Sequence, residues 1–358
     1  MPSHFLFTVC QIGSEAALKQ EVSQRYPSLR FSFSRPGFVT FRIPDEAARD
    51  RRFAVHSTFA RTWGFSLGKV AGTDGQQLAR DLWTSFVGHH PPDRLAQFRH
   101  LHVWERDREL PGDFAFEPGI TPQAMAVGDL ILEHRPHVQT PWPLALNEHA
   151  DIDDRVLDCV IVEPDEWWFG WHQASFFETR WPGGVPSFDK PQKMISRTYL
   201  KMVEALLWSE LPVQAGDRCV EIGSAPGGSC QALLDRGCVV VGIDPAEMDP
   251  IVLANPRFTH VRARAKDLKR SVFRDFRWLM ADANVAPKYT LDTVAAIVTR
   301  PEARFDGLVL TLKLTNPALA AALPLFTKRI RTWGYRFVRT RQLAFNRQEV
   351  CVVASERN

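Results

Sequence analysis

The sequence lacks several features that would identify a class of protein at once. No run of apolar residues approaches the ~18 that a membrane span needs, and the opening MPSHFLFTVCQIGSEAAL has neither the cationic start nor the small-residue cleavage site of a signal peptide. Internal repeats and low-complexity tracts are also missing. We therefore expect a cytoplasmic protein without a membrane-spanning segment.

Disulfide and metal-binding patterns are missing as well. The six cysteines have no C-x-x-C spacing, and several lie in apolar strand-like runs, so we expect buried reduced thiols. Three histidine pairs stand out, His89 with His90, His100 with His102 and His134 with His137, but no partner set completes a tetrahedral site. The sequence gives no reason to expect a metal.

An excess of charge of one sign is missing too, since the net charge is only +3. Two segments are nevertheless rich in arginine and lysine, VRARAKDLKR (261–270) and KRIRTWGYRFVRTRQ (328–342). Local clusters of this kind attract a phosphate backbone without a high total charge. Each segment fits a solvated helix face or strand end equally well, so both interpretations stay open.

Strand and helix patterns alternate in the C-terminal half. The expected strands, nearly all apolar and separated by helical segments, are RCVEIGS (218–224), VVVGID (239–244), FTHVRA (258–263), RWLMADA (277–283) and GLVLTLKL (307–314). Such runs are typical of a parallel sheet covered on both faces. YRFVRTRQL and EVCVVAS, joined by AFNRQ, should pair antiparallel. The pattern predicts an α/β, Rossmann-like domain with a mostly parallel seven-stranded sheet.

The N-terminal half has a different pattern, in which short strands bracket a helix at SEAALKQEVSQRY (14–26). RVLDCVIVE (155–163) and EWWFGWHQA (166–174) predict a hairpin that closes an α+β unit. The aromatic residues of EWWFGWH suit either stacking on exposed bases or the core of the domain. A segment rich in proline and glycine, ETRWPGGVPSFDKPQK (178–193), reads as a linker between the halves.

The most informative segment is VEIGSAPGGSCQALL (220–234), an apolar strand followed by a glycine turn and a helix. Its turn residues are Gly223, Ser224, Ala225, Pro226, Gly227 and Gly228. This spacing is neither G-x-G-x-x-G nor a G-K-[ST] phosphate loop. Backbone N–H groups at such a turn suit a small carboxylate, and Asp244 at the end of the next strand suits a ribose diol. A carboxylate together with a ribose indicates S-adenosylmethionine; a turn required only by helix–strand packing is the alternative.

EIGSAPGG resembles the methyl-donor motif of the FtsJ-type RNA 2′-O-methyltransferases. That family is marked by a dispersed Lys-Asp-Lys-Glu set, and each member has a counterpart here in the expected element: Lys201 in SRTYLKMVEAL, Asp282 in LMADANVAP, Lys313 in LTLKL and Glu349 in FNRQEVCVV. The resemblance implies that these four residues are catalytic. It also implies that the glycine turn, Asp244 and Asp282 bind the methyl donor.

The N-terminal half adds a second resemblance. VCQIGSEAALKQEV, PGFVTFR, STFARTW, the hairpin and FDKPQKMISRTYLKMVEA resemble, in order, the RlmM family of large-subunit rRNA cytidine 2′-O-methyltransferases. This implies a ferredoxin-like segment (1–65), a THUMP-like RNA-binding domain (66–176), a linker (177–193) and an FtsJ-type methyltransferase domain (194–358). It also implies large-subunit 23S rRNA as the partner of a monomeric enzyme that needs no metal.

The expected roles follow from the chemistry of a sugar hydroxyl, which is a poor nucleophile at neutral pH. Lys313 is expected nearest the 2′-hydroxyl, as a base if burial and the charge of Lys201 lower its pKa, or otherwise as an orienting group. Asp282 would hold Lys313, and Glu349 would balance the charges. Capped at Ser196, the helix that carries Lys201 is expected to turn this lysine toward solvent.

Two positions depart from the family pattern. Arg264 stands where an acidic residue usually meets the adenine, with Asp267 three residues later, and Glu221 stands where an aspartate is common. Another RNA, such as tRNA, and a non-catalytic RNA-binding or ribosome-assembly role stay open as alternatives. Base N-methylation is disfavoured because DANVAP (282–287) lacks the [ND]-P-P-[YF] motif.

Overall fold

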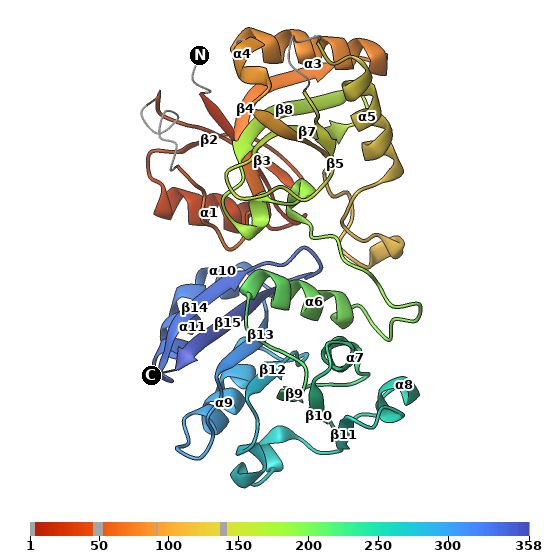
Figure 1. Ribbon diagram of the computed structural model, residues 1–358. Helices are drawn as coiled ribbons and strands as arrows, with labels where there is room; N and C mark the ends of the chain where they lie inside the picture. The colour runs from red at the N-terminus through yellow and green to blue at the C-terminus, as the bar shows by residue number, and fades with distance from the viewer. Residues whose placement is uncertain (1–3, 46–52, 91, 137–141, 358) are drawn as a thin grey trace. The chain divides into compact units, whose positions relative to one another are not determined.

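The chain divides into two compact units, Met1–Phe188 and Asp189–Asn358, each built on one sheet (Figure 1). The computed structural model describes residues 4–45, 53–90, 92–136 and 142–357. Within these ranges, no helix has both the length and the apolar composition to cross a bilayer. All six cysteines are buried free thiols, as the sequence predicted.

The first unit contains an eight-stranded sheet with the order β2-β3-β1-β4-β8-β7-β5-β6. Its strands are β1 (Phe5–Val9), β2 (Arg30–Arg35), β3 (Phe38–Arg42), β4 (Thr62–Ala71), β5 (Phe98–Glu105), β6 (Ala145–Leu146), β7 (Arg155–Glu163) and β8 (Glu166–Gln173). Its helices are α1 (Glu15–Arg25), α3 (Gly75–His89), α4 (Pro92–Leu95) and α5 (Pro122–Glu133), with short 3-10 turns at Asp113–Ala115, Phe177–Thr179 and Pro182–Gly184. Only β5 pairs parallel with its neighbours, β7 and β6; the other pairs are antiparallel.

The predicted hairpin of residues 155–174 is confirmed as the antiparallel pair β7–β8. Alternate side chains on these strands point to opposite faces. Trp167 and Phe169 point into the core, where α3 and α5 pack, and are about 2% and 1% exposed. Trp168 faces the other way and stacks on Phe33 with ring centroids 5.4 Å apart. The aromatic residues of this hairpin therefore pack largely within their own unit.

The division of the first unit at residue 65 stays a prediction. β4 runs from Thr62 to Ala71 across that position, and one sheet continues on both sides of it. The boundary between the two units falls at residue 188, within the predicted linker 177–193.

The second unit contains a seven-stranded sheet with the order β11-β10-β9-β12-β13-β15-β14. Its strands are β9 (Arg218–Ile222), β10 (Val239–Ile243), β11 (Phe258–Val261), β12 (Trp278–Ala281), β13 (Gly307–Lys313), β14 (Tyr335–Arg341) and β15 (Glu349–Arg357). Its helices are α6 (Thr198–Ser209), α7 (Gly228–Asp235), α8 (Pro250–Leu253), α9 (Pro287–Val298), α10 (Pro317–Ala321) and α11 (Leu323–Arg331), with 3-10 turns at Ala265–Asp267 and Arg270–Phe273. The five strands from β11 to β13 are parallel, and β15 is antiparallel to both β13 and β14. The predicted α/β domain with a mostly parallel sheet and a reversed final strand is confirmed.

This strand order fixes where a ligand can bind. From β9 the chain crosses through α7 to β10 on one side, and from β12 it crosses through α9 to β13 on the other. Right-handed crossovers in opposite directions place the two helices on opposite faces and open a crevice at the carboxyl ends of β9 and β12. The glycine turn follows β9, and Asp282 follows β12.

Candidate active site

Three strands and one helix bring the four predicted catalytic residues together. Asp282 comes directly after β12, and Lys313 is the last residue of the neighbouring strand β13. Glu349 is the first residue of the antiparallel strand β15, and its register partner is Lys313. Because β15 runs backwards, its start meets the end of β13. Lys201, on α6, completes the group, which we call the Lys-Asp-Lys-Glu tetrad.

Each carboxylate of the tetrad contacts both lysines. Lys201 Nζ donates to Asp282 Oδ2, and it donates to Glu349 Oε1 at 2.9 Å. Lys313 Nζ donates to Glu349 Oε2 and lies 3.5 Å from Asp282 Oδ1. The two ammonium groups are thus bridged by two carboxylates, and the formal charges of the four groups cancel.

Lys201 and Glu349 are buried and Asp282 and Lys313 are partly buried, with side chains about 11% exposed for Lys201, 10% for Asp282, 20% for Lys313 and 5% for Glu349. Burial lowers the pKa of Lys201, but Asp282 and Glu349 outweigh it, so the net shift is upward and the ammonium form is stabilised. Burial raises the pKa of Glu349, but Lys201 and Lys313 together bring it down to about 2. Lys313 is the most exposed member of the tetrad.

The expectation that Lys201 faces solvent was wrong. The helix begins at Thr198 after Arg197, so Ser196 is not its N-cap. Lys201 and Glu204 are 9% and 0% exposed. The side of the helix that carries Lys201 is buried because Lys201 pairs with Asp282, which follows β12, and with Glu349 of β15.

Two residues that the sequence analysis missed support the tetrad. Glu204 accepts hydrogen bonds from the backbone N–H groups of Ala344 (2.8 Å) and Phe345 (3.1 Å). These bonds fix the loop between β14 and β15, and in this loop Asn346 Nδ2 donates to Glu349 Oε1 at 3.2 Å. A glutamate inside MVEALLWS is ordinary on an amphipathic helix, so only the fold reveals this role.

The glycine turn lies beside Asp282. Gly223 has φ +80°, and a Cβ there would lie 2.8 Å from Ala283 Cα and 2.9 Å from the carbonyl oxygen of Asp282. At Gly228 a Cβ would lie 2.2 Å from Ser196 Oγ and 2.4 Å from Thr198 Oγ1. Close packing of the protein chain therefore accounts for these two glycines, and their role in binding a donor stays a prediction.

Asp244 follows β10 and braces the same turn. Its Oδ2 accepts from Ala225 N at 3.2 Å, and its Oδ1 accepts from Ala246 N at 2.8 Å. No side chain in the described part of the chain caps the N-terminus of α7, which begins at Gly228. Free N–H groups at a helix start attract a carboxylate. A half-buried carboxylate and an uncapped helix start thus lie on either side of the turn.

Glu221 is buried within β9, about 1% exposed. Burial raises its pKa to about 7, although the Cys230 and Ser229 side chains, as hydrogen-bond partners, lower it. Cys230 Sγ donates to Glu221 Oε2 at 2.9 Å. The longer glutamate, where an aspartate was expected, thus reaches under helix α7.

The basic segments are only partly free to bind an anion. Arg264 and Asp267 are both exposed, and their suggested roles at an adenine stay predictions. In the segment 328–342, Arg341 is 2% exposed, and Arg339 donates to the carbonyl oxygen of Ser209. Arg329 pairs with Asp292 at 2.7 Å. Part of this cluster therefore stabilises the fold.

In a comparison with known proteins, residues 194–331 of this unit match the model of the FtsJ-like methyltransferases. The chain is 31% identical over 178 residues to the ribosomal RNA large subunit methyltransferase M of Aromatoleum aromaticum, an alignment that covers 48% of each protein. It is 24% identical over 310 residues to the protein of the same name from Shewanella amazonensis, covering 77% of this chain and 76% of that one. The chain thus spans about half the length of the first relative.

Among solved structures, the fibrillarin pre-rRNA processing protein of Methanococcus jannaschii superposes with a TM-score of 0.37 at 11% identity, covering 58% of this chain and 85% of that one. A superposition at this level has no bearing on function.

Proposed function

We propose that this chain, whose residues 194–331 belong to the FtsJ-like methyltransferases, is an S-adenosylmethionine-dependent RNA 2′-O-methyltransferase that modifies a cytidine of large-subunit 23S rRNA. The observation that carries the proposal is the tetrad: two lysines bridged by two carboxylates at the carboxyl edge of a parallel sheet, with Lys201 and Glu349 buried and Asp282 and Lys313 partly buried. Burying four charges is costly, and a protein that only bound RNA would gain nothing from it.

The residues around the glycine turn fit the methyl donor. The uncapped start of α7 would hold its carboxylate, and the half-buried Asp244 would accept hydrogen bonds from its ribose. When bound, the donor supplies a methyl group on a sulfonium sulfur for transfer to the ribose oxygen. Asp282 lies between this turn and the lysines, because its N–H is bonded to the carbonyl oxygen of Ile222 at the end of β9.

Lys313 would contact the 2′-hydroxyl, since it is the tetrad member with the largest exposed fraction. As a neutral amine it would orient the oxygen lone pair toward the methyl group and receive the hydroxyl proton. As an ammonium it would only orient the oxygen, and the hydroxyl proton would leave to solvent as the methyl group is transferred. Lys201 is held as an ammonium by two carboxylates, so it would act as a fixed positive charge rather than a base. Glu349 and Asp282 would keep both lysine side chains in place.

The first unit would select the RNA. One ribose gives the catalytic cleft no sequence to read, so backbone and shape contacts must come from elsewhere in the chain. We assign residues 1–65 to a ferredoxin-like segment, 66–176 to a THUMP-like RNA-binding domain, 177–193 to a linker, and 194–358 to the catalytic domain. The choice of large-subunit rRNA draws on the names of the relatives. We expect a monomeric cytoplasmic enzyme.

The experiment is methyl transfer from labelled donor to rRNA by the purified chain and three lysine variants. Lys313→Met should bind the donor yet transfer methyl groups ~10²- to 10⁴-fold more slowly. Lys288→Met is the matched control, because Lys288 is an exposed lysine of the same unit, and it should retain full activity. Lys201→Met should lose both activity and stability.

Three outcomes would contradict this proposal in whole or in part. Undiminished turnover by Lys313→Met would show that Lys313 does not activate or orient the 2′-hydroxyl. Transfer to tRNA but not to rRNA would keep the chemistry and change the substrate, and no transfer to any RNA would favour a non-catalytic RNA-binding protein.

A further inference from the structure

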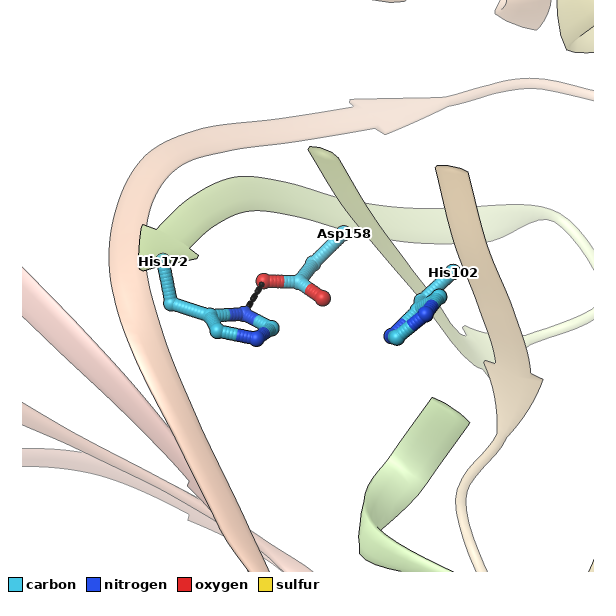
Figure 2. A group of neighbouring side chains, drawn as sticks. All are labelled: His102, Asp158 and His172. Carbon is cyan, nitrogen blue, oxygen red and sulfur yellow. Dashed lines mark hydrogen bonds and ion pairs between the residues drawn. The ribbon is translucent and has the colours of Figure 1, made fainter. Parts of the chain in front are cut away.

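A second group of polar side chains lies in the first unit, on three adjacent strands. His102 on β5 and Asp158 on β7 are register partners. Opposite Asp158 on β8 is Gly170, and His172 lies two residues farther along. Because side chains repeat every two residues on one face of a sheet, all three point to the same side. Figure 2 shows the Asp158 carboxylate between the two imidazole rings.

These three side chains are buried without any aqueous contact. His102 and Asp158 are 0% exposed, and His172 is 2% exposed. On the same strand face, Trp104 and Val160 belong to one apolar cluster, and Val156 and Ala174 belong to another. Burying a carboxylate between apolar clusters costs several kcal/mol of desolvation free energy unless the carboxylate is paired or bound to a metal. The group therefore requires a physical explanation.

Backbone carbonyl groups fix the orientation of both imidazole rings. His102 Nε2 lies 2.8 Å from the carbonyl oxygen of Glu148, and His172 Nε2 lies 2.7 Å from that of Thr179. A carbonyl oxygen only accepts, so both Nε2 atoms must carry the proton. In His102 this leaves Nδ1 as an electron-pair donor. In His172, Nδ1 faces Asp158 Oδ2 and must lose its proton before it can bind a metal.

Two acceptor atoms at the centre of this group have no hydrogen-bond donor among the residues that the structure describes. They are Nδ1 of His102 and Oδ1 of Asp158. The second oxygen, Asp158 Oδ2, lies 2.6 Å from His172 Nδ1. Two buried lone pairs without a donor are unfavourable, and a cation would satisfy both at once.

We propose that His102, Asp158 and His172 bind a divalent transition-metal ion of the zinc class, through Nδ1 of each histidine and the aspartate carboxylate. One ligand atom from each residue lies within 4.8 Å of the other two. Two imidazoles and one carboxylate are a donor set suited to zinc, cobalt or nickel. Metal-bound histidines typically donate their other N–H to a backbone carbonyl, as both rings do here.

Binding requires two local changes. Ligand atoms around a tetrahedral zinc lie about 3.3 Å apart, given bonds of about 2.0 Å, so side-chain rotations must close the widest pair. The hydrogen bond between His172 and Asp158 must open, and the proton on His172 Nδ1 leaves as the metal binds. Gly170, opposite Asp158, is packed closely against β4, since a Cβ there would lie 2.1 Å from the carbonyl oxygen of Phe65. The movements must therefore come from the side chains of the three ligands themselves.

The site was not apparent in the sequence. His100 and His102 are only two residues apart in the sequence, but His100 does not belong to the group of His102, because His100 Nε2 pairs with Asp154 at 3.1 Å. The partners of His102 lie 56 and 70 residues away, as the numbering of Asp158 and His172 gives. The expectation of no metal rested on short spacings, which do not reveal ligands from separate strands.

The test uses the full chain, expressed in defined medium with zinc and assayed for metal content after gel filtration. The chain should carry about one zinc per molecule. After removal of the metal with a chelator, titration with Co²⁺ should give saturable d–d absorption. His102→Gln and Asp158→Asn should each weaken Co²⁺ binding at least ~10-fold. Loss of a residue that only contacts a metal ligand already lowers metal affinity by this factor, and loss of a ligand should cost no less.

His100→Gln is the matched control, because His100 lies on the same strand but outside the group. It should bind Co²⁺ like the unmodified chain. Circular dichroism identifies variants that fail to fold. His102→Gln keeps the hydrogen bond between His172 and Asp158, so we expect this variant to stay folded. Absence of both zinc and saturable Co²⁺ binding would overturn the proposal, as would equal Co²⁺ affinity in His102→Gln and the unmodified chain. The three residues would then be a hydrogen-bonded histidine–aspartate pair with a neutral neighbour.

Discussion

Glu349→Gln is the substitution whose effect the structure defines best. The carboxylate contacts both lysines of the tetrad, which bring its pKa from the usual value of about 4.5 for a glutamate down to about 2. A shift of roughly 2.5 pH units at 1.36 kcal/mol each is worth about 3 kcal/mol. Because the folded-state pKa is the lower one, this stabilisation is complete well above pH 4.5 and is lost as the pH falls through about 2.

The amide has no charge to lose, so the destabilisation caused by Glu349→Gln should depend on pH. We expect about 3 kcal/mol at pH 7 and roughly half of that at pH 3. The assay is urea unfolding of the full chain, in which hydrogen exchange of β15 peptides identifies the transition of the second unit.

Glu356→Gln is the control, since Glu356 lies on the same strand with its side chain 61% exposed and 3.7 Å from Arg336. An exposed pair of this kind contributes at most ~1 kcal/mol, so little change is expected. Equal destabilisation by Glu349→Gln at pH 7 and pH 3 would refute the reasoning, as would a loss no larger than that of the control.

Three further substitutions test other parts of the site. Glu221→Gln should stabilise the chain by about 3 kcal/mol at pH 8 and by less than ~1 kcal/mol at pH 5. The raised pKa of this buried carboxyl means that the unfolded chain ionises more readily than the folded one, and this difference destabilises the folded chain more as the pH rises. Thermal unfolding at both pH values measures the change in stability. Glu204→Ala leaves the N–H groups of two buried residues unpaired and should cost about 2 to 5 kcal/mol in urea unfolding. Asp244→Asn can accept only one of the two backbone bonds and should weaken donor binding ~10-fold by calorimetry.

Much of the second unit could be predicted because its signals are local. Apolar strand runs separated by helical segments predicted the parallel sheet, and the short AFNRQ connection predicted the antiparallel pair β14–β15. The four tetrad residues were chosen from a resemblance in four separate motifs. The structure brings them together because β12, β13 and β15 are neighbours in the sheet.

The features that were missed depend on contacts between distant segments. The burial of Lys201 follows from β12 and β15 packing against a helix whose own pattern shows one apolar face. Glu204 accepts from backbone groups 140 and 141 residues away, and no spacing rule covers such a distance. In the first unit, the parallel pairing of β5 with β7 places His102 beside Asp158. Without the order of the strands, these residues have no visible relation.

The proposed ribose methylation is tested by mapping the methylated position in RNA. The purified chain would be incubated with labelled S-adenosylmethionine and unmodified large-subunit rRNA, and the product cleaved by alkali, which spares a phosphodiester next to a 2′-O-methylated ribose. We expect one resistant linkage, at a cytidine, and loss of this linkage with Lys313→Met. Label on a base, or no transfer by a chain that binds the donor, would contradict it.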